Sequence, residues 1–571
     1  MEMKKIKEKM TLHPIMTIMI LIALTIVISG LFTLFGVQVT YNKVNANTLK
    51  YSTEVISANN LFSLSGIKYI FSTTVSNFVS FVPLSSLIII LIGLGVMEKS
   101  GFLKTVFTLL TKNAKKYTVT FTLVLISVLA SIIGDLSFII LIPISALLFI
   151  YGKRNPAIGI IATFAGLTCG QGLNILFTST DSSLLSNTLT SAWTLDNNYT
   201  ISIWAFIFIM FVACILVSLI ITFITEKFIV EKVENYTFET EEKEFKIGKK
   251  EQKGLVLSAI AGLIYFIIFI YNIIPGLPFS GNLLDKTQTL YIDKLFSYDS
   301  FFSNGFVFIV TLLFIILGFF YGLGAKTIKN NKDLCDDLGH SLDEIGKILV
   351  LIFFASTFIS IFRYTNIGEI VVGFLTKILG TLEFSGIPLI ILLFVIVLLS
   401  TILIPSSTSK WLIISGTAIP LCMNAGLTPE FTQTIFRFAE SATMGLTPLF
   451  AYYVIYLAYL EKYNQTEQNF SQDESRQARF RKVFYTKLSN RMESRLKKGL
   501  EASYVDLKVE DNETLEIVEP TLSVLNPDVD KIETNSKVVL KDLKAIYVDS
   551  KGRAAIIRTD IQLGIPNLKF A

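Results

Sequence analysis

Polar side chains with the chemistry of a solute- or ion-binding site gather between Ile404 and Pro448. An apolar run ends at Ile404 and opens into Pro-Ser-Ser-Thr-Ser-Lys-Trp, and a second apolar run leads on to Arg437 and Glu440. Hydroxyls, a guanidinium and a carboxylate can hold an anionic solute or a cation through hydrogen bonds. Irregular backbone at membrane depth is tolerated only where protein or a water-filled cavity satisfies its polar groups. We therefore expect a solute site built from broken membrane helices.

A second polar break interrupts the apolar run that begins at Ala157. Free N–H groups at such a break suit carboxylates, and opposed carbonyls and hydroxyls suit a cation. The alternative is that the hydroxyls only bond to carbonyls of their own helices. The predicted substrate- or ion-binding residues are Asn174, Thr178, Ser179 and Asp181 in this break, and Ser406, Ser407, Thr408, Trp411, Arg437 and Glu440 in the later stretch.

Several of these candidates have a structural interpretation beside the functional one. Asp181 and Glu440 are ionisable residues within spans, which usually mark a transport pathway, unless they lie in water at the outer edge. Trp411 either stacks on an aromatic ring of the solute or packs beside a hairpin tip. Pro405 and Pro448 are expected to shape the breaks.

Composition places these residues in a polytopic membrane protein. Of 571 residues, 52% are hydrophobic and 17% are charged, and the mean hydropathy is +0.60. The net charge of +5 comes with lysines that lie beside apolar runs, which indicates membrane orientation and not nucleic-acid binding. Two histidines, four scattered cysteines and the lack of a phosphate-binding loop leave few candidates for an enzyme. We expect no cofactor and no metal centre, with a possible sodium site unassigned.

Apolar runs and basic flanks predict the topology. Lysines at the start precede the run 15–36, which places the N-terminus in the cytoplasm, and the basic segment 98–117 suits a helix along the cytoplasmic surface. Residues 118–151 form either a re-entrant hairpin, which we favour, or two full spans; Asp135 lies at the turn and is expected to cap a helix. A second hairpin, 386–420, turns at 405–408. The result is eight crossings with both termini cytoplasmic.

The chain also divides into two similar halves. The segment "IILIPISALLFIYG" (139–152) matches "TILIPSSTSKWLIISG" (401–416), and "AGLT" recurs at 165 and 425. By the predicted topology the copies, about 82–225 and 348–461, are inverted repeats within a membrane domain of residues 1–463. Residues 464–571 are expected to form a cytoplasmic tail or a small domain. The predicted fold class is an all-α polytopic membrane protein with inverted repeats, two re-entrant hairpins and two broken helices.

With these breaks in view, residues 15–463 resemble the aminobenzoyl-glutamate transporter (AbgT) family. The most specific motifs are "GVMEKSG" (95–101), "NPAIGIIATFAGLTCGQGLNIL" (155–176), "IPSSTSKW" (404–411) and "GLTPEFTQTIFRFAESATMGLTPL" (426–449). The chain departs at Gly172, where the family usually has Ser, and at Glu440, where it has Asp. Family members are described with nine spans, whereas the topology above has eight. The difference depends on whether residues 366–380 cross the membrane.

The resemblance implies a dimeric secondary transporter in the plasma membrane, coupled to a proton or sodium gradient. Its substrate would be p-aminobenzoyl-glutamate or a related small aromatic dicarboxylate, or, in some members, sulfonamide-type antimetabolites that are exported. A membrane-embedded sensor that signals through residues 464–571 is a third possibility. The residues alone do not distinguish import from export, the coupling ion or the exact substrate.

Overall fold

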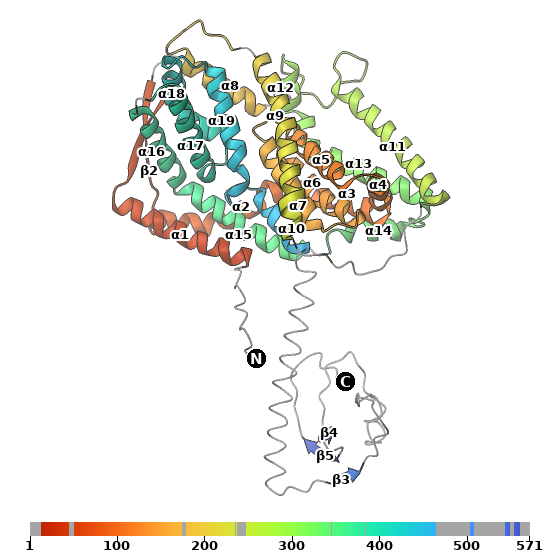
Figure 1. Cartoon of the computed structure of the whole chain (residues 1–571). Coiled ribbons are helices and arrows are strands. Elements are labelled where there is room, and N and C mark those ends of the chain that lie inside the picture. Colours follow the sequence, from red (N-terminus) through yellow and green to blue (C-terminus); the bar gives the residue numbers. More distant parts are fainter. Residues whose placement is uncertain are drawn as a thin grey trace. The chain divides into compact units, whose positions relative to one another are not determined.

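The structure, a computed structural model, describes residues 13–44, 51–173, 179–201, 203–233, 236, 247–297, 299–343, 345–382, 384–463, 503–506, 543–548 and 553–559. The chain divides into two compact units, Met1–Glu467 and Gln468–Ala571 (Figure 1). Each unit is described by itself.

The first unit is mostly helical, as the hydropathy predicts. Among its described residues, six helical segments are long and apolar enough to cross a membrane. The helices are α1 (Pro14–Leu34), α2 (Leu64–Val79), α3 (Val82–Lys99), α4 (Phe102–Lys112), α5 (Lys116–Leu129), α6 (Leu136–Tyr151), α7 (Pro156–Gly170), α8 (Ser179–Ala192), α9 (Ile203–Ile224), α10 (Val230–Lys232), α11 (Lys249–Ile273), α12 (Tyr291–Phe296), α13 (Phe301–Ala325), α14 (Asn331–His340), α15 (Ile345–Tyr364), α16 (Ile367–Thr381), α17 (Ile387–Leu403), α18 (Ser407–Asn424) and α19 (Pro429–Thr443).

The first predicted hairpin consists of α5 and α6, which are shorter than a full span. A 3₁₀ turn (Ala130–Ile133) ends α5, and Gly134 reverses the chain with a φ of 65° that favours glycine. Helix α7 packs against both α5 and α6 and ends at Gly170, before the predicted polar break. The turn therefore lies at the position that the sequence predicts, whereas residues 174–178 of the predicted break lie outside the described residues and 179–183 belong to α8.

The second hairpin consists of α17 and α18, and α19 packs against both. The chain leaves helical geometry between Leu403 and Ser407, around Pro405. Helix α19 continues into a 3₁₀ turn (Met444–Leu446), and helix resumes at 453–463, beyond Pro448. Thr443 and Thr447 donate hydrogen bonds of 3.2 and 2.6 Å to carbonyls near the end of α17, at Leu398 and Ile402. Both prolines thus lie in breaks, and the Thr447 hydroxyl satisfies the Ile402 carbonyl, which the end of α17 leaves free.

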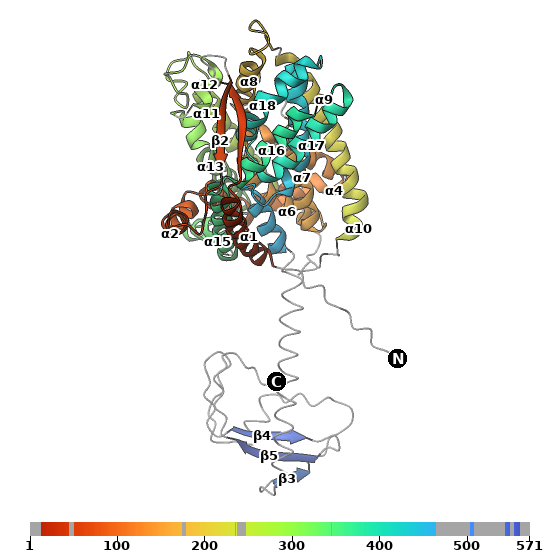
Figure 2. The same cartoon turned by 90° about the vertical axis from the view of Figure 1, so that its left-hand side faces the viewer.

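The segment between α1 and α2 contains two strands, so the all-α prediction is wrong here. Strands β1 (Gln38–Val44) and β2 (Tyr51–Ser57) form an antiparallel hairpin that pairs Gln38 with Ser57. Its buried side chains, Val39 and Tyr41, alternate as in a half-buried strand. The burying surface is α16 and α18, more than 300 residues away, so the local sequence gave little indication of it (Figure 2).

β1 approaches α18 very closely at Gly416. A Cβ atom at this position would lie 2.4 Å from the carbonyl oxygen of Asn42, so only glycine permits the contact. Helix α16, which occupies the segment that separates eight spans from nine, has 15 residues and is shorter than the roughly 20 that cross a bilayer.

The second unit contains an antiparallel three-stranded sheet in the order β3–β5–β4 (Figure 2). The strands are β3 (Ser503–Asp506), β4 (Leu543–Val548) and β5 (Arg553–Thr559). A strand near Tyr547 agrees with the strand-like sequence there. Residues 476–498, which are rich in Lys and Arg and helix-prone in sequence, lie outside the described residues.

Candidate functional site

Two cations and two carboxylates meet where α8, α18 and α19 come together. Lys410 Nζ lies 2.9 Å from Glu440 Oε1, and Arg437 Nη1 lies 3.2 Å from Glu440 Oε2. Arg437 Nη2 lies 3.0 Å from Asp181 Oδ1. We call Lys410, Glu440, Arg437 and Asp181 the charge quartet. The side chains of Lys410 and Glu440 are fully buried, that of Arg437 is 2% exposed and that of Asp181 is 16% exposed.

The local structure explains how the quartet forms. Thr428 caps α19, Pro429 follows, and Arg437 and Glu440 are then three residues apart on one helix face, where side chains can pair. Ser406 caps α18, and Lys410 lies in its first turn. A cation there is disfavoured by the helix dipole, so it depends on nearby acceptors.

Hydroxyl groups complete the surroundings of the buried pair Lys410 and Glu440. Lys410 Nζ donates to Thr401 Oγ1 on α17 at 3.0 Å, and Ser407 Oγ donates to Glu440 Oε1 at 2.5 Å. An unpaired charge inside a membrane protein is strongly unfavourable, and these bonds lower that cost. Ser406 and Thr408 are exposed beside the buried pair.

A continuous series of hydrogen bonds connects the quartet to the turn of the first hairpin. Arg437 Nη2 donates to the Gln171 carbonyl at 2.8 Å, and Gln171 Nε2 donates to Asp135 Oδ1 at 3.2 Å. Through Glu440 and Ser407 the same series reaches the turn of the second hairpin. The two turns, far apart in sequence, are therefore linked through α19.

One sequence interpretation needs correction, and for Trp411 the structure favours the packing alternative. Asp135 caps no helix: its φ and ψ of −63° and −21° are helical, whereas an N-cap requires extended geometry, and its side chain makes no capping bond. Trp411 has no exposed surface; its Nε1 donates to Thr188 Oγ1 at 2.9 Å and its ring centroid lies 4.5 Å from that of Phe436. In this structure Trp411 is therefore a packing residue, because α8 and α19 cover its ring.

Of the remaining candidates, Asp181, Ser407, Arg437 and Glu440 lie in direct contact. Asn174 and Thr178 lie outside the described residues, and Ser179 begins α8.

Lys410 and Gln171 belong to the site although the sequence interpretation did not select them. A signal for Lys410 was present, because a lysine between two apolar runs needs a carboxylate partner in the membrane. Gln171 contributes a backbone carbonyl, which every residue has, so its role depends on the fold. Within the described residues no group of three or more His, Cys, Asp or Glu is arranged to hold a metal ion.

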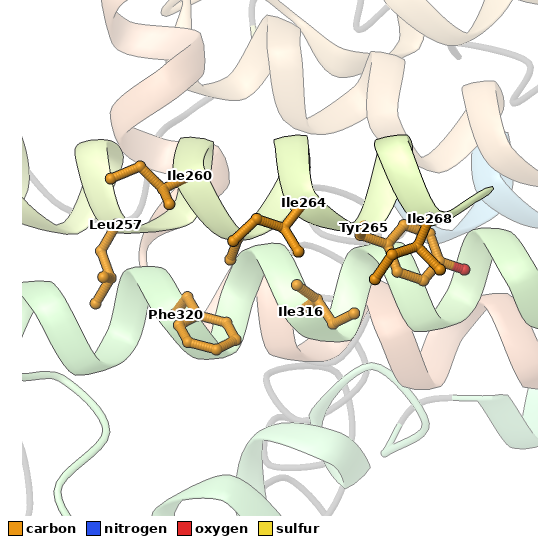
Figure 3. A pocket seen from close by; sticks show the side chains of 8 residues that line it. Leu257, Ile260, Ile264, Tyr265, Ile268, Ile316 and Phe320 are labelled. Carbon is orange, nitrogen blue, oxygen red and sulfur yellow. The ribbon is translucent and has the colours of Figure 1, made fainter. Parts of the chain in front are cut away.

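A separate hollow of about 240 Å³ lies between α11 and α13 (Figure 3). Its polar group, the Tyr265 hydroxyl, already donates to the Ile309 carbonyl at 2.7 Å. The hollow therefore offers little to an ionic solute. Its lining residues are Leu257, Ile260, Ala261, Ile264, Tyr265, Ile268, Ile316 and Phe320.

The sequence pattern of the AbgT putative transporter family matches residues 3–468. The chain belongs to this family. Like the sequence motifs, the match extends across the spans, both hairpins and the charge quartet. This AbgT-family protein is therefore a multi-pass membrane transporter and not an enzyme.

One sequence relative and two solved structures are similar to this chain. The chain is 24% identical to the p-aminobenzoyl-glutamate transport protein of Escherichia coli (strain K12) over 451 residues, which are 79% of this chain and 85% of the relative. It is also similar to two solved structures. The YdaH transporter of Alcanivorax borkumensis is 25% identical, with a TM-score of 0.42 over 79% of this chain and 92% of that one. Neisseria gonorrhoeae MtrF, described among antimetabolite efflux pumps, is 27% identical, with a TM-score of 0.43 over 80% and 89%.

Proposed function

We propose that this AbgT-family protein is a secondary active transporter of p-aminobenzoyl-glutamate or a related small aromatic dicarboxylate across the plasma membrane. A proton or sodium gradient drives it, it works as a homodimer, and both termini are cytoplasmic. The observation that carries the proposal is the buried charge quartet at the two helix breaks.

The quartet has the chemistry that a dicarboxylate needs. Arg437 already directs its planar fork at Glu440, Asp181 and the Gln171 carbonyl, so its geometry suits bidentate carboxylate binding. A second cation, Lys410, lies on the other side of Glu440. Protonation or displacement of the protein's own carboxylates would free both cations for the two carboxylates of a glutamate moiety. The name of the Escherichia coli relative supports this substrate class.

Efflux of sulfonamide-type antimetabolites is the alternative that the same fold allows. A sulfonamide lacks the second carboxylate, so it would use fewer of the quartet's charges. Competition by a sulfonamide against the dicarboxylate, and the direction of net movement, separate the two functions.

The test is movement of labelled p-aminobenzoyl-glutamate in proteoliposomes of the full chain, under imposed proton or sodium gradients. We expect uptake or exchange in wild type and a loss in Arg437→Ala. Arg363→Ala is the matched control, because Arg363 is exposed at the end of α15. The proposal is wrong if folded wild-type protein moves no solute, or if Arg437→Ala moves it as well as wild type does. Cross-linking in the membrane tests the homodimer.

A further inference from the structure

Lys410 places an ammonium group inside a pocket of oxygen atoms at the start of α18. Its Nζ contacts Thr401 Oγ1 and Glu440 Oε1 at 3.0 and 2.9 Å, and Ser407 Oγ reaches the same carboxylate oxygen. Carboxylate and hydroxyl oxygens are the ligands that a hard metal cation such as Na⁺ also uses. The ring of Phe436, with its centroid 5.5 Å from Nζ, closes another side. The pocket thus has the ligands of a cation site but holds the chain's own cation.

We propose that Lys410 is a tethered cation that fills the coupling-ion site, so that the ion exchanged with the two sides of the membrane is a proton carried on Nζ. This assignment rests on the proposed function as a gradient-driven transporter, and it selects the proton over sodium. In the exchange, the ammonium releases one proton to water at one side and becomes a neutral amine. The amine then takes one proton from water at the other side.

Lysine is suited to this role and arginine is not. A lysine ammonium can give up its proton when it is buried, whereas a guanidinium stays charged. Ser406 and Thr408, within four residues of Lys410, are exposed, and the proposal requires that water reaches Nζ from this end of α18. A sodium ion in the same pocket would lie against the ammonium, and like charges at such a distance repel strongly. Protonated Lys410 therefore excludes sodium.

The charges around Lys410 come from few elements. Glu440 on α19 pairs with Nζ at 2.9 Å, and Arg437 on the same helix pairs with the other oxygen of Glu440 at 3.2 Å. On α8, Asp181 pairs with Arg437, and α17 carries no titratable residue. On α16, Lys377 is exposed and Glu369 is half-buried near Tyr41, whose hydroxyl donates to Glu54. Within the described residues, loss of the Lys410 proton would leave Arg437 as the cation paired with Glu440.

The first experiment compares thermal unfolding of the purified full chain in sodium chloride and in choline chloride. Wild type should unfold at the same temperature in both salts. Lys410→Ser removes the ammonium and leaves the oxygen pocket, so sodium should raise its unfolding temperature by a few degrees. Lys329→Ser, at an exposed lysine beside α14, is the matched control and should behave as wild type. Sodium stabilisation of wild type, or none in folded Lys410→Ser, would overturn the assignment.

The second experiment uses sodium-free proteoliposomes and labelled p-aminobenzoyl-glutamate. Wild type should accumulate solute under a pH gradient and show no response to a sodium gradient alone. Accumulation driven by a sodium gradient and not by a pH gradient overturns the inference without any variant. Lys410→Arg should lose the response to the pH gradient, and full proton-driven accumulation by this variant also contradicts it. If wild type moves no solute under any gradient, the proposed function fails. The sodium comparison in the unfolding experiment still decides the role of Lys410.

Discussion

Gly172 lies where the first helix break meets α19, and its replacement should separate them. A Cβ atom there would lie 2.0 Å from Ser441 Oγ and 2.4 Å from the Arg437 carbonyl oxygen. The serine hydroxyl can rotate away, but the carbonyl belongs to the backbone of α19. Since ordinary contacts begin at 3.4 Å, Gly172→Ala requires the break and α19 to move apart by about 1 Å. Overpacking of this kind destabilises proteins by about 1–3 kcal/mol.

The same displacement acts on the neighbouring hydrogen bond from Arg437 to the Gln171 carbonyl. This bond has an ordinary length of 2.8 Å, and 1 Å of separation would bring it beyond hydrogen-bonding distance. Hydrogen bonds to charged groups contribute about 1.5–3 kcal/mol, so the charge quartet should lose part of its fixed geometry. We therefore expect both a lower unfolding temperature and weaker solute binding in Gly172→Ala.

The assay is thermal unfolding and equilibrium solute binding of the full-length variant in detergent. Gly305→Ala is the control, because Gly305 lies in α13 and has no atom within 4 Å of its Cβ position. It should leave stability unchanged or raise it slightly. Wild-type stability and wild-type affinity in Gly172→Ala would refute the close contact between the break and α19.

Three other predictions concern the quartet, the second unit and an extramembrane loop. Arg437→Lys should weaken solute binding at least tenfold, because an ammonium lacks the bidentate fork. If Arg437→Lys binds with wild-type affinity, and if Glu440→Gln rescues Arg437→Ala, then the two residues form a purely structural pair. Truncation after Asn464 should leave transport intact, as measured in proteoliposomes, and its loss in a folded protein would favour the sensor. Hydrogen bonds from Ser297 and neighbouring groups lower the pKa of Asp285 from 3.8 to about 2. Its carboxylate therefore stabilises the loop before α13 above about pH 4, and the difference in loop proteolysis between wild type and Asp285→Asn should disappear as the pH falls towards 2.

The membrane helices and both hairpins could be predicted from the sequence because their signals are local. Apolar runs, basic flanks and the Gly134 turn each lie within a few residues. The pairing of Arg437 with Glu440 was also predictable, since both residues lie on one helix face. The inverted repeat, the re-entrant depth of the hairpins and the orientation of the termini stay predictions.

Features that depend on distant segments could not be predicted in the same way. The β-hairpin is buried by helices that follow it by hundreds of residues, and the Lys410 pocket combines side chains from three helices. The sequence comparison noted Gly172 only as a departure from the family pattern. The structure gives its physical reason, which is the contact with Arg437 and Ser441.

The balance of charges in the quartet has an electrical consequence. With all four side chains ionised, two cations and two carboxylates cancel, so movement of this group through the membrane does no work against the transmembrane voltage. After Lys410 has released its proton the same group carries one negative charge, and full transfer across 100 mV then involves about 2.3 kcal/mol. The voltage would therefore act on one half of the cycle more than on the other. An inside-negative potential would oppose inward movement of the quartet when Lys410 is deprotonated and would favour its outward movement.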